Sequence, residues 1–199
     1  ITNCLNFGNP ENEEIMGEFA ECLDGIKEAC EFLKFPVVSG NVSFYNGTNK
    51  KNIFPTPVIG GVGLIQNLNK TLSHKFKKEK SIIVLIGKTF GHLEQSCFLK
   101  ENYSIIDGNP PEINLINEKN NGEMVLKLIE RKLVLSAHDI SNGGLLIALS
   151  EMSMGSNLGI KIEKSKKLRD LKEYFFGEDQ GRYVLEIDEK NLDLIEKFL

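Results

Sequence analysis

The sequence predicts an α/β (α+β) protein built from two domains. Segments with helical periodicity alternate with short apolar segments along the 199 residues. Hydrophobic residues make up 41% of the chain, which is enough apolar material for each domain to have its own core. A polar stretch, residues 67–80, divides the segments into two groups. We therefore expect one domain at residues 1–72 and a second at residues 73–199.

The first domain is expected to contain one long helix, over residues 10–33. Asn9 can cap this helix, Pro10 suits its first position, and Pro36 ends it. Apolar residues recur at steps of three or four and form a single stripe: Ile15, Phe19, Leu23, Ile26, Cys30 and Leu33. The residues before the helix are interpreted as a polar turn. Strands are expected after it, at residues 37–39 and 58–65.

The second domain is expected to alternate strands and helices. Its first strand, Ile82–Ile86, is apolar throughout, which is typical of a strand packed on both faces. A helix at residues 143–154 should be capped by Ser141 or Asn142 and should bury one leucine-rich face. The other expected elements are a helix at residues 118–132, strands at 134–137 and 182–187, and a last helix marked by Leu192, Ile195 and Leu199.

The charge pattern argues against nucleic-acid binding. The net charge is −4, the pI is about 5.5, and the sequence has no basic stripe. The one dense basic run, residues 74–80, contains a glutamate and is interpreted as a solvated linker. No apolar run approaches the roughly 20 residues needed to cross a bilayer, so no membrane association is expected.

The cysteines indicate a reducing compartment. Cys4, Cys22, Cys30 and Cys97 have the spacing of neither a zinc site nor a disulfide framework, so a cytoplasmic protein with free thiols is expected. The chain opens on Ile1 without a signal-peptide pattern. Because its first ten residues follow no other element, we expect a chain that begins inside a domain.

Two polar segments of the first domain are candidates for nucleotide chemistry. Residues 2–10 combine carboxamides, a glycine and a helix start, which suit a phosphate or ribose; an elaborate helix cap is the alternative. In residues 39–46, Gly40 allows a ligand close to the backbone. Asn41 offers a hard oxygen suited to Mg²⁺, and Ser43 offers a hydroxyl for a phosphate oxygen. A plain strand-to-loop turn is the alternative.

Two more polar segments lie in the second domain. His138 and Asp139 are adjacent in an expected strand, where neighbouring side chains point to opposite faces, so a hydrogen bond between them is not expected. The glycine pair 143–144 opens a helix and is a candidate for holding a phosphate. Glu178 is interpreted as holding a ligand amine or pairing with Arg182, with a surface turn as the alternative.

Several common sites are excluded. The sequence has no G-x-x-x-x-G-K-[ST] loop and no compact dinucleotide-binding fingerprint after a strand. It also lacks the sharp nucleophile turn of serine hydrolases. His74 and His92 follow no partner pattern and are expected to be exposed to solvent.

Taken together, the polar segments resemble one family closely. They are similar to the second half of phosphoribosylformylglycinamidine synthase, large subunit, in its stand-alone small form. That enzyme belongs to a superfamily of ATP-dependent synthetases with a PurM-like fold. The resemblance spans nearly the whole chain and is carried by residues 2–10, 36–46, 55–57, 136–139 and 176–178.

The resemblance implies a partial second N-type domain followed by a truncated C-type domain. It places Asn3 and Gly40 where the family contacts ATP. It also places Asn41 at a magnesium position and Ser43 at a contact to formylglycinamide ribonucleotide. No catalytic residue is expected in this chain, because the family's catalytic histidine lies in the first half of the enzyme.

The resemblance further implies an activity and partners. The family is a carbon–nitrogen ligase of purine biosynthesis that uses ATP and Mg²⁺. ATP activates the substrate amide oxygen as a phosphate, and ammonia then displaces the phosphate. A glutaminase subunit supplies the ammonia, and a small accessory subunit completes the complex. The chain is expected to need the N-terminal half of the same enzyme for activity. Separately from the resemblance, residues 58–65 are expected to form an unpaired apolar sheet edge, so the isolated chain is expected to be a dimer or aggregation-prone, with this strand at the contact.

Two alternatives stay open. One is another synthetase of the superfamily, of the aminoimidazole ribonucleotide or selenophosphate synthetase type, or a hydrogenase-maturation protein. Those of the selenophosphate and maturation types carry a phosphate loop rich in glycine and aspartate near their N-terminus, which this sequence lacks. The other alternative is a non-catalytic dimerisation module.

Overall fold

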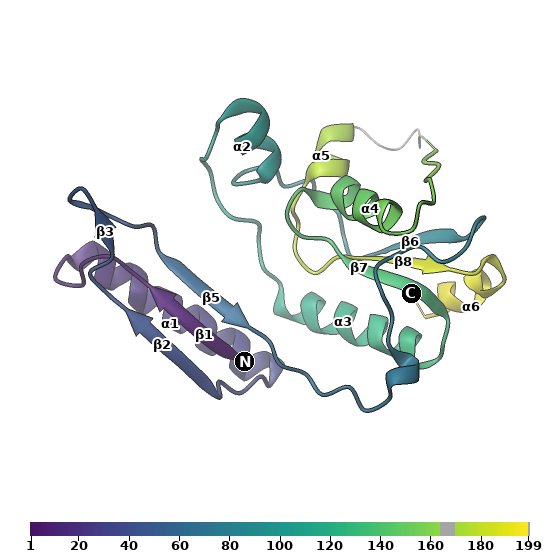
Figure 1. Ribbon diagram of the computed structural model, residues 1–199, viewed down its shortest axis with the longest axis horizontal. Coiled ribbons are helices and arrows are strands. Elements are labelled where there is room, and N and C mark those ends of the chain that lie inside the picture. Colours follow the sequence, from purple (N-terminus) through teal and green to yellow (C-terminus); the bar gives the residue numbers. More distant parts are fainter. Residues whose placement is uncertain (164–169, 199) are drawn as a thin grey trace. The chain divides into compact units, whose positions relative to one another are not determined.

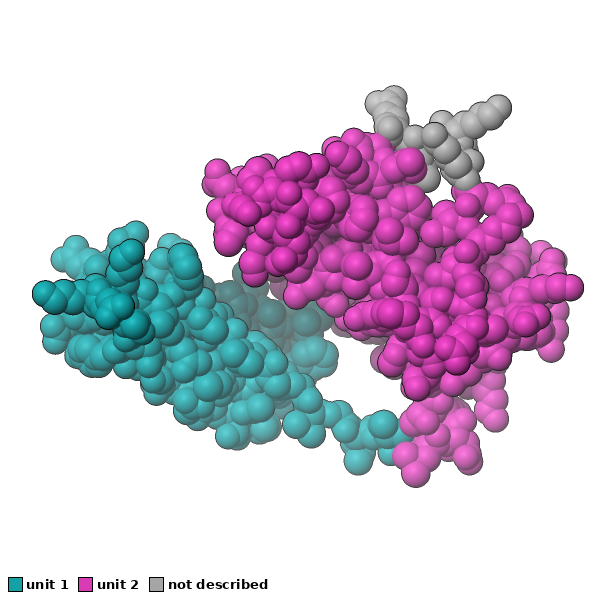
Figure 2. Space-filling view, turned by 45° about the horizontal axis from the view of Figure 1, so that its top comes forward, with its two compact units in different colours: residues 1–66 teal, residues 67–199 magenta. Residues whose placement is uncertain are grey.

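The computed structural model describes residues 1–163 and 170–198. The chain forms two compact units, unit 1 at residues 1–66 and unit 2 at residues 67–199 (Figure 2). Both units combine helices and strands (Figure 1), which confirms the expected α/β class. Leu199, expected in the last helix, lies outside the described residues. Within those residues, every helix is too short or too polar to cross a membrane.

Unit 1 is a three-stranded sheet with one long helix. The strand order is β2-β1-β5, with β1 at Thr2–Asn6, β2 at Ser39–Ser43 and β5 at Thr56–Gly60. β1 runs parallel to β2 and antiparallel to β5. The parallel pair is joined by α1 (Glu13–Leu33), as expected because parallel strands need a crossover of a dozen or more residues. A small hairpin, β3 (Gly47–Thr48) and β4 (Lys51–Asn52), precedes β5 in the chain.

The prediction of a polar turn before the helix is wrong. The segment forms β1, the central strand of the sheet. Leu5 and Phe7 are buried in a core with Ile15 of α1, so one face of β1 packs against the helix. Alternation along a strand sends Thr2, Cys4 and Asn6 to the opposite face. Pairing on both sides therefore holds a polar sequence in an extended conformation that its composition does not predict.

The long helix starts later than predicted. Residues 9–12 form a turn, in which the Asn12 N–H donates to the Asn9 carbonyl oxygen at 3.1 Å. Asn12 rather than Asn9 is the N-cap, and its Oδ1 accepts from the Glu14 N–H at 2.9 Å. The predicted end at residue 33 is confirmed. Lys34 there adopts a left-handed conformation, and its N–H donates to the Cys30 carbonyl oxygen.

Unit 2 has helices on both faces of an antiparallel sheet ordered β6-β8-β7. β6 is Ile82–Ile86, β7 is Val134–Asp139 and β8 is Tyr183–Ile187. Residues of α3 (Leu115–Glu130) and α6 (Leu192–Glu196) form a core on one face. Residues of α4 (Gly144–Met154) form a core on the other face. The remaining elements are η1 (Leu68–Lys70), α2 (Cys97–Tyr103), α5 (Leu171–Phe176) and η2 (Glu189–Asn191).

Packing on both faces of β6 is confirmed. Ile82, Val84 and Ile86 contact the core beneath α3, whereas Ile83 and Leu85 contact the core beneath α4. β6 is nevertheless an edge strand, because it pairs with β8 alone among the described strands. An apolar run therefore indicates two covered faces, but it does not reveal whether the strand lies at the centre or the edge of a sheet.

Six of the seven residues at 74–80 are exposed, as the interpretation of a solvated segment expects, but the segment is not a free linker. Phe76 is buried in the core beneath α4. Glu186 of β8 is fully buried, at 0% exposure, and its carboxylate organises this segment. The N–H groups of Lys77 and Lys78 donate to it at 2.9 and 3.0 Å. Hydroxyl donors complete its shell: Ser81 at 2.9 Å and Ser136 at 2.7 Å.

We expect Glu186→Ala to destabilise unit 2 strongly. The substitution leaves two backbone N–H groups and two hydroxyls without their acceptor, which costs about 3–5 kcal/mol. Urea unfolding followed by circular dichroism measures the change. Glu130→Ala is the matched control, because Glu130 is exposed and its removal should change stability by less than about 0.5 kcal/mol. Equal stability of the two variants would contradict the assigned role of Glu186.

Candidate functional site

The four residues predicted to form a nucleotide site lie on two neighbouring strands. β1 and β2 pair in parallel, with Asn3 opposite Gly40, Cys4 opposite Asn41 and Asn6 opposite Ser43. The register therefore brings two segments together that are separated by the whole length of α1. Asn41 and Gly40 are exposed, whereas Asn3 and Ser43 are half-buried.

The pairing also divides the four residues between the two faces of the sheet. Asn3 alternates with Leu5, so Asn3 and its partner Gly40 point to the face that α1 covers. Asn41 and Ser43 point to the opposite face. β2 is an edge strand among the described strands, so a ligand lying across this edge can reach both faces.

The neighbours of Gly40 and Ser43 give each residue a structural role as well. The carboxamide of Asn3 occupies the space that a Gly40 Cβ would need, so Gly40 lets this side chain lie flat on β2. The Asn46 Nδ2 donates to the Ser43 hydroxyl at 3.1 Å and to the Phe7 carbonyl oxygen at 3.0 Å. The hydroxyl of Ser43 is thereby held in place at the end of β2.

Asn41 fits a magnesium ion as one ligand among several. Mg²⁺ is commonly held by one or two protein oxygens together with phosphate oxygens and water. Asn41 provides one exposed carboxamide oxygen of this kind. In residues 1–163 and 170–198, no group of three His, Cys, Asp or Glu side chains is arranged to hold a metal ion. A complete shell would therefore draw on nucleotide phosphates and water.

The polar segment before β8 is a structural centre rather than a surface turn. The Glu178 Oε1 accepts from the Cys97 N–H and from the Gly143 N–H, both at 2.8 Å. It thereby satisfies free donors at the first turns of α2 and α4, where a negative charge is favourable. The prediction that Glu178 pairs with Arg182 is wrong, and its carboxylate is already engaged by the backbone.

Asp179 and Arg182 complete this centre. The Asp179 carboxylate accepts from the N–H groups of Phe90, Gly91 and His92 at 2.9–3.1 Å. Arg182 is only 1% exposed, and its guanidinium donates to the Gly177 carbonyl oxygen and to the Asp179 carbonyl oxygen. Burial lowers the pKa of Arg182, and the nearby Asp179 carboxylate, 3.8 Å away, opposes this shift.

The glycine pair 143–144 does not offer a free phosphate site. The Gly143 N–H is bound by Glu178, and the Gly144 N–H donates to the Ser141 carbonyl oxygen at 3.1 Å. Gly143 has a φ of 82° and serves as the N-cap of α4, so the predicted cap by Ser141 or Asn142 is wrong. A Cβ on Gly144 would meet the backbone of residues 175–177, which explains the second glycine.

His138 and Asp139 form the hydrogen bond that their adjacency argued against. His138 Nδ1 lies 3.2 Å from Asp139 Oδ1, and its Nε2 lies 3.1 Å from Glu151 Oε2. Asp139 is the last residue of β7, and its carboxylate is free to turn back toward the imidazole. Burial opposes ionisation of Asp139, yet hydrogen bonds led by that from Ser141 lower its pKa. The exposed His74 ring packs edge-on against His138, with 5.4 Å between ring centroids.

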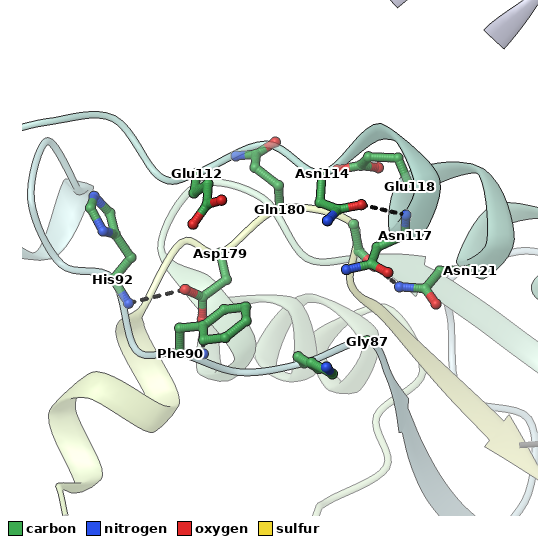
Figure 3. A pocket seen from close by; sticks show the side chains of 12 residues that line it. Gly87, Phe90, His92, Glu112, Asn114, Asn117, Glu118, Asn121, Asp179 and Gln180 are labelled. Atoms are coloured by element: carbon green, nitrogen blue, oxygen red, sulfur yellow. Dashed lines mark hydrogen bonds between the residues drawn. The ribbon is translucent and has the colours of Figure 1, made fainter. Parts of the chain in front are cut away.

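Unit 2 also contains a pocket of about 310 Å³ that the sequence did not predict (Figure 3). Three segments line it: residues 87–92 after β6, residues 112–121 at the start of α3, and residues 179–181 before β8. His92, expected to be exposed, is half-buried here, and its Nε2 lies 2.8 Å from the Asn109 carbonyl oxygen. The cluster of carboxamides in residues 114–121 is the sequence feature that could have indicated a pocket. The interpretation of that region rested on its helical periodicity alone.

Each of the two units matches one domain of a known two-domain family. Residues 1–65 match the N-terminal domain, and residues 78–199 the C-terminal domain, of AIR synthase related protein. The chain belongs to this family. More particularly, it is a homologue of phosphoribosylformylglycinamidine synthase subunit PurL. It is 54% identical over all 199 residues to the subunit of Pelagibacter ubique, and 50% identical over 95% of its length to that of Bradyrhizobium diazoefficiens.

The similarity covers only part of these relatives. The chain spans 27% of the Pelagibacter subunit and 26% of the Bradyrhizobium subunit. Among solved structures, T. maritima PurL complexed with ATP matches 99% of the chain with a TM-score of 0.63 and 16% identity, over 31% of that protein. E. coli HypE, a hydrogenase maturation protein, matches the whole chain with a TM-score of 0.59 and 14% identity, over 62% of its length. At such identities the likeness shows the shared fold.

We expect Glu178→Ala to destabilise unit 2 by about 2–4 kcal/mol, because two buried helix-end N–H groups lose their acceptor. Glu178→Gln keeps an acceptor oxygen and should cost roughly half as much. Glu101→Ala is the control on α2, where the side chain is exposed and should be neutral within about 0.5 kcal/mol. Thermal unfolding of the three variants measures this order. A neutral Glu178→Ala would show that the carboxylate does not hold these segments.

Proposed function

We propose that this chain forms part of a phosphoribosylformylglycinamidine synthase, an ATP-dependent carbon–nitrogen ligase of purine biosynthesis. The observation that supports the proposal most strongly is the 54% identity to a PurL subunit across every residue of the chain. The pairing of β1 with β2 adds to it, because it places all four predicted ligand-contacting residues on adjacent strands.

Each of the four residues, on the central strand β1 or the edge strand β2, has a proposed role. Asn3 and Gly40 contact ATP, with the Asn3 carboxamide donating or accepting hydrogen bonds from where it lies over Gly40. Asn41 supplies one oxygen ligand to Mg²⁺, which when bound neutralises charge on the phosphates. Ser43, oriented by Asn46, contacts the formylglycinamide ribonucleotide through its hydroxyl. None of these residues is proposed to transfer a proton in the reaction.

The complete reaction is proposed to need more than this chain. The chain covers about a quarter of its PurL relatives, and the catalytic histidine is proposed to lie in the remaining part. Ammonia is proposed to come from a glutaminase subunit, with a small accessory subunit as a further partner. The fold match to PurLQS from T. maritima is consistent with such an assembly.

A second proposal, self-association, rests on one feature of unit 1. β5 is an edge strand among the described strands, and its apolar residues Val58 and Ile59 are 53% and 47% exposed. An exposed apolar edge can pair with the same edge of another chain. The isolated chain is therefore proposed to form a homodimer through β5.

For the synthase proposal we expect two outcomes. The purified 199-residue chain alone should show no synthase turnover. A chimera in which this chain replaces the matching region of the Pelagibacter subunit should form formylglycinamidine ribonucleotide from substrate, ATP and ammonia. In that chimera, Asn3→Ala and Asn41→Ala should each lower kcat/KM about tenfold or more, because each removes a polar contact to a charged ligand.

Asn120→Ala is the matched control for these variants, since Asn120 is an exposed carboxamide on α3. Its kcat/KM should match that of the unmodified chimera. The Mg²⁺ dependence of turnover should shift for Asn41→Ala and stay unchanged for Asn3→Ala. Turnover by the chain alone, or an inactive but folded chimera, would argue against the proposal.

For self-association, sedimentation of the isolated chain should show a dimer at tens of micromolar. Ile59→Lys should shift it to monomer, because a charge on an edge strand opposes pairing. Leu126→Lys, at an exposed position of α3, should leave the dimer intact. Hydrogen exchange should protect β5 only where the chain associates. Strong protection of β5 in a dilute monomer would contradict an open edge.

A further inference from the structure

The pocket in unit 2 is lined by residues to which the proposed synthase function assigns no role. It lies about the Asp179 turn, with residues 87–90 on one side and residues 112–121 on the other (Figure 3). Its volume of about 310 Å³ falls at the lower end of the range for ligand pockets. All of its walls belong to unit 2, whereas the residues proposed to contact ATP belong to unit 1.

The pocket wall carries two carboxylates, of Glu112 and Glu118, together with several carboxamides whose oxygens accept and whose N–H groups donate hydrogen bonds. Among residues 1–163 and 170–198, neither carboxylate has an ion-pair partner or a hydrogen-bond donor within range; Glu118 is half-buried, whereas Glu112 is exposed at the rim. The Asn121 Nδ2 is used, donating to the Gly181 carbonyl oxygen at 2.9 Å, which leaves its oxygen free. The Gln180 side chain contributes another amide oxygen at the wall.

The other charged groups of the pocket wall do not offset the negative charges of Glu112 and Glu118. The Asp179 carboxylate is already satisfied by three backbone N–H groups. Lys88 is the basic side chain of the wall besides the half-buried His92, and it is exposed and can extend into solvent. Burial raises the pKa of Glu118, as expected where a carboxylate leaves water without a paired cation.

An aromatic ring adds a second kind of contact. Phe90 lines the pocket and is 78% exposed, although most phenylalanines are buried. The face of an aromatic ring attracts cations. The Asp179 carboxylate binds the N–H of Phe90 itself, so the position of this backbone is held firmly beside the pocket.

We propose that this pocket binds a small organic cation carrying a guanidinium or primary ammonium group. Its N–H donors would pair with Glu112 and Glu118 and with the amide oxygens of Asn121 and Gln180. The ring of Phe90 would cover its charged end. A cation without N–H groups would have the charge but not these hydrogen bonds, and an anion would meet two unpaired carboxylates.

The test is a titration of the ¹⁵N-labelled 199-residue chain with methylguanidine, followed by amide chemical shifts. We expect saturable shifts at residues 87–92 and 179–181, with a Kd of about 1 mM or tighter. Tetramethylammonium should bind at least about tenfold more weakly, and inorganic phosphate should not shift these amides. Glu118→Gln keeps the shape of the side chain and should weaken methylguanidine binding about tenfold.

Glu123→Gln is the matched control on the same helix, because Glu123 is exposed and lies outside the pocket. It should bind like the unmodified chain. Glu112→Gln repeats the test on the second carboxylate if Glu118→Gln perturbs the fold. Absence of saturable shifts with methylguanidine would overturn the proposal. So would equal binding of tetramethylammonium, or shifts produced by adenosine or phosphate but not by the cation.

Discussion

The turn at residues 177–182 is the constraint on which much of unit 2 depends. Two neighbouring carboxylates, of Glu178 and Asp179, accept backbone N–H groups from three separate segments of the chain. Asp179 is buried and Glu178 is half-buried, and a carboxylate removed from water is costly unless donors fill its lone pairs, so these contacts favour a fold in which the three segments meet at this turn. Arg182 then binds the carbonyl groups of the same turn and offsets part of its charge. The starts of α2 and α4 and one wall of the pocket are positioned by these contacts.

Unit 1 is held together by a smaller core than unit 2 and leaves more of its sheet exposed. Its core is small and apolar, and it joins one face of β1 to α1. The other face carries hydroxyls, carboxamides and a thiol, and both outer strands have free edges among the described residues. Such a sheet has polar groups and unpaired backbone available at its edges, which suits ligand contact and also invites association. The same exposure that makes β2 a candidate nucleotide contact makes β5 a candidate interface.

The glycines at the candidate nucleotide and phosphate sites can be explained by packing within the protein as well as by ligand binding. Gly40 is needed because the Asn3 carboxamide fills the space of a side chain, whether or not a nucleotide binds. Glycines 143 and 144 look like a phosphate loop, yet their N–H groups are bound by Glu178 and by a local carbonyl group. Internal carboxylates thus occupy the position that an external anion would take at a helix start. The pocket wall in unit 2 carries the carboxylates of Glu112 and Glu118, which have no partner among the described residues, and these decide the charge of the ligand proposed for it.

The sequence by itself determined the elements whose signals are local. Apolar periodicity predicted α1 and α4, and apolar runs predicted β6 and β8, because each pattern reflects burial along one element. The polar segments of the first domain pointed to the candidate ligand-contacting residues that lie on β1 and β2. Only the tertiary structure decided that Thr2–Asn6 is a central strand, since that depends on pairing with β2 and β5 on either side. It also decided the partners of Glu178, which lie 35 and 81 residues away along the chain. Contacts over such separations follow from how elements pack, and no local pattern of residues records them.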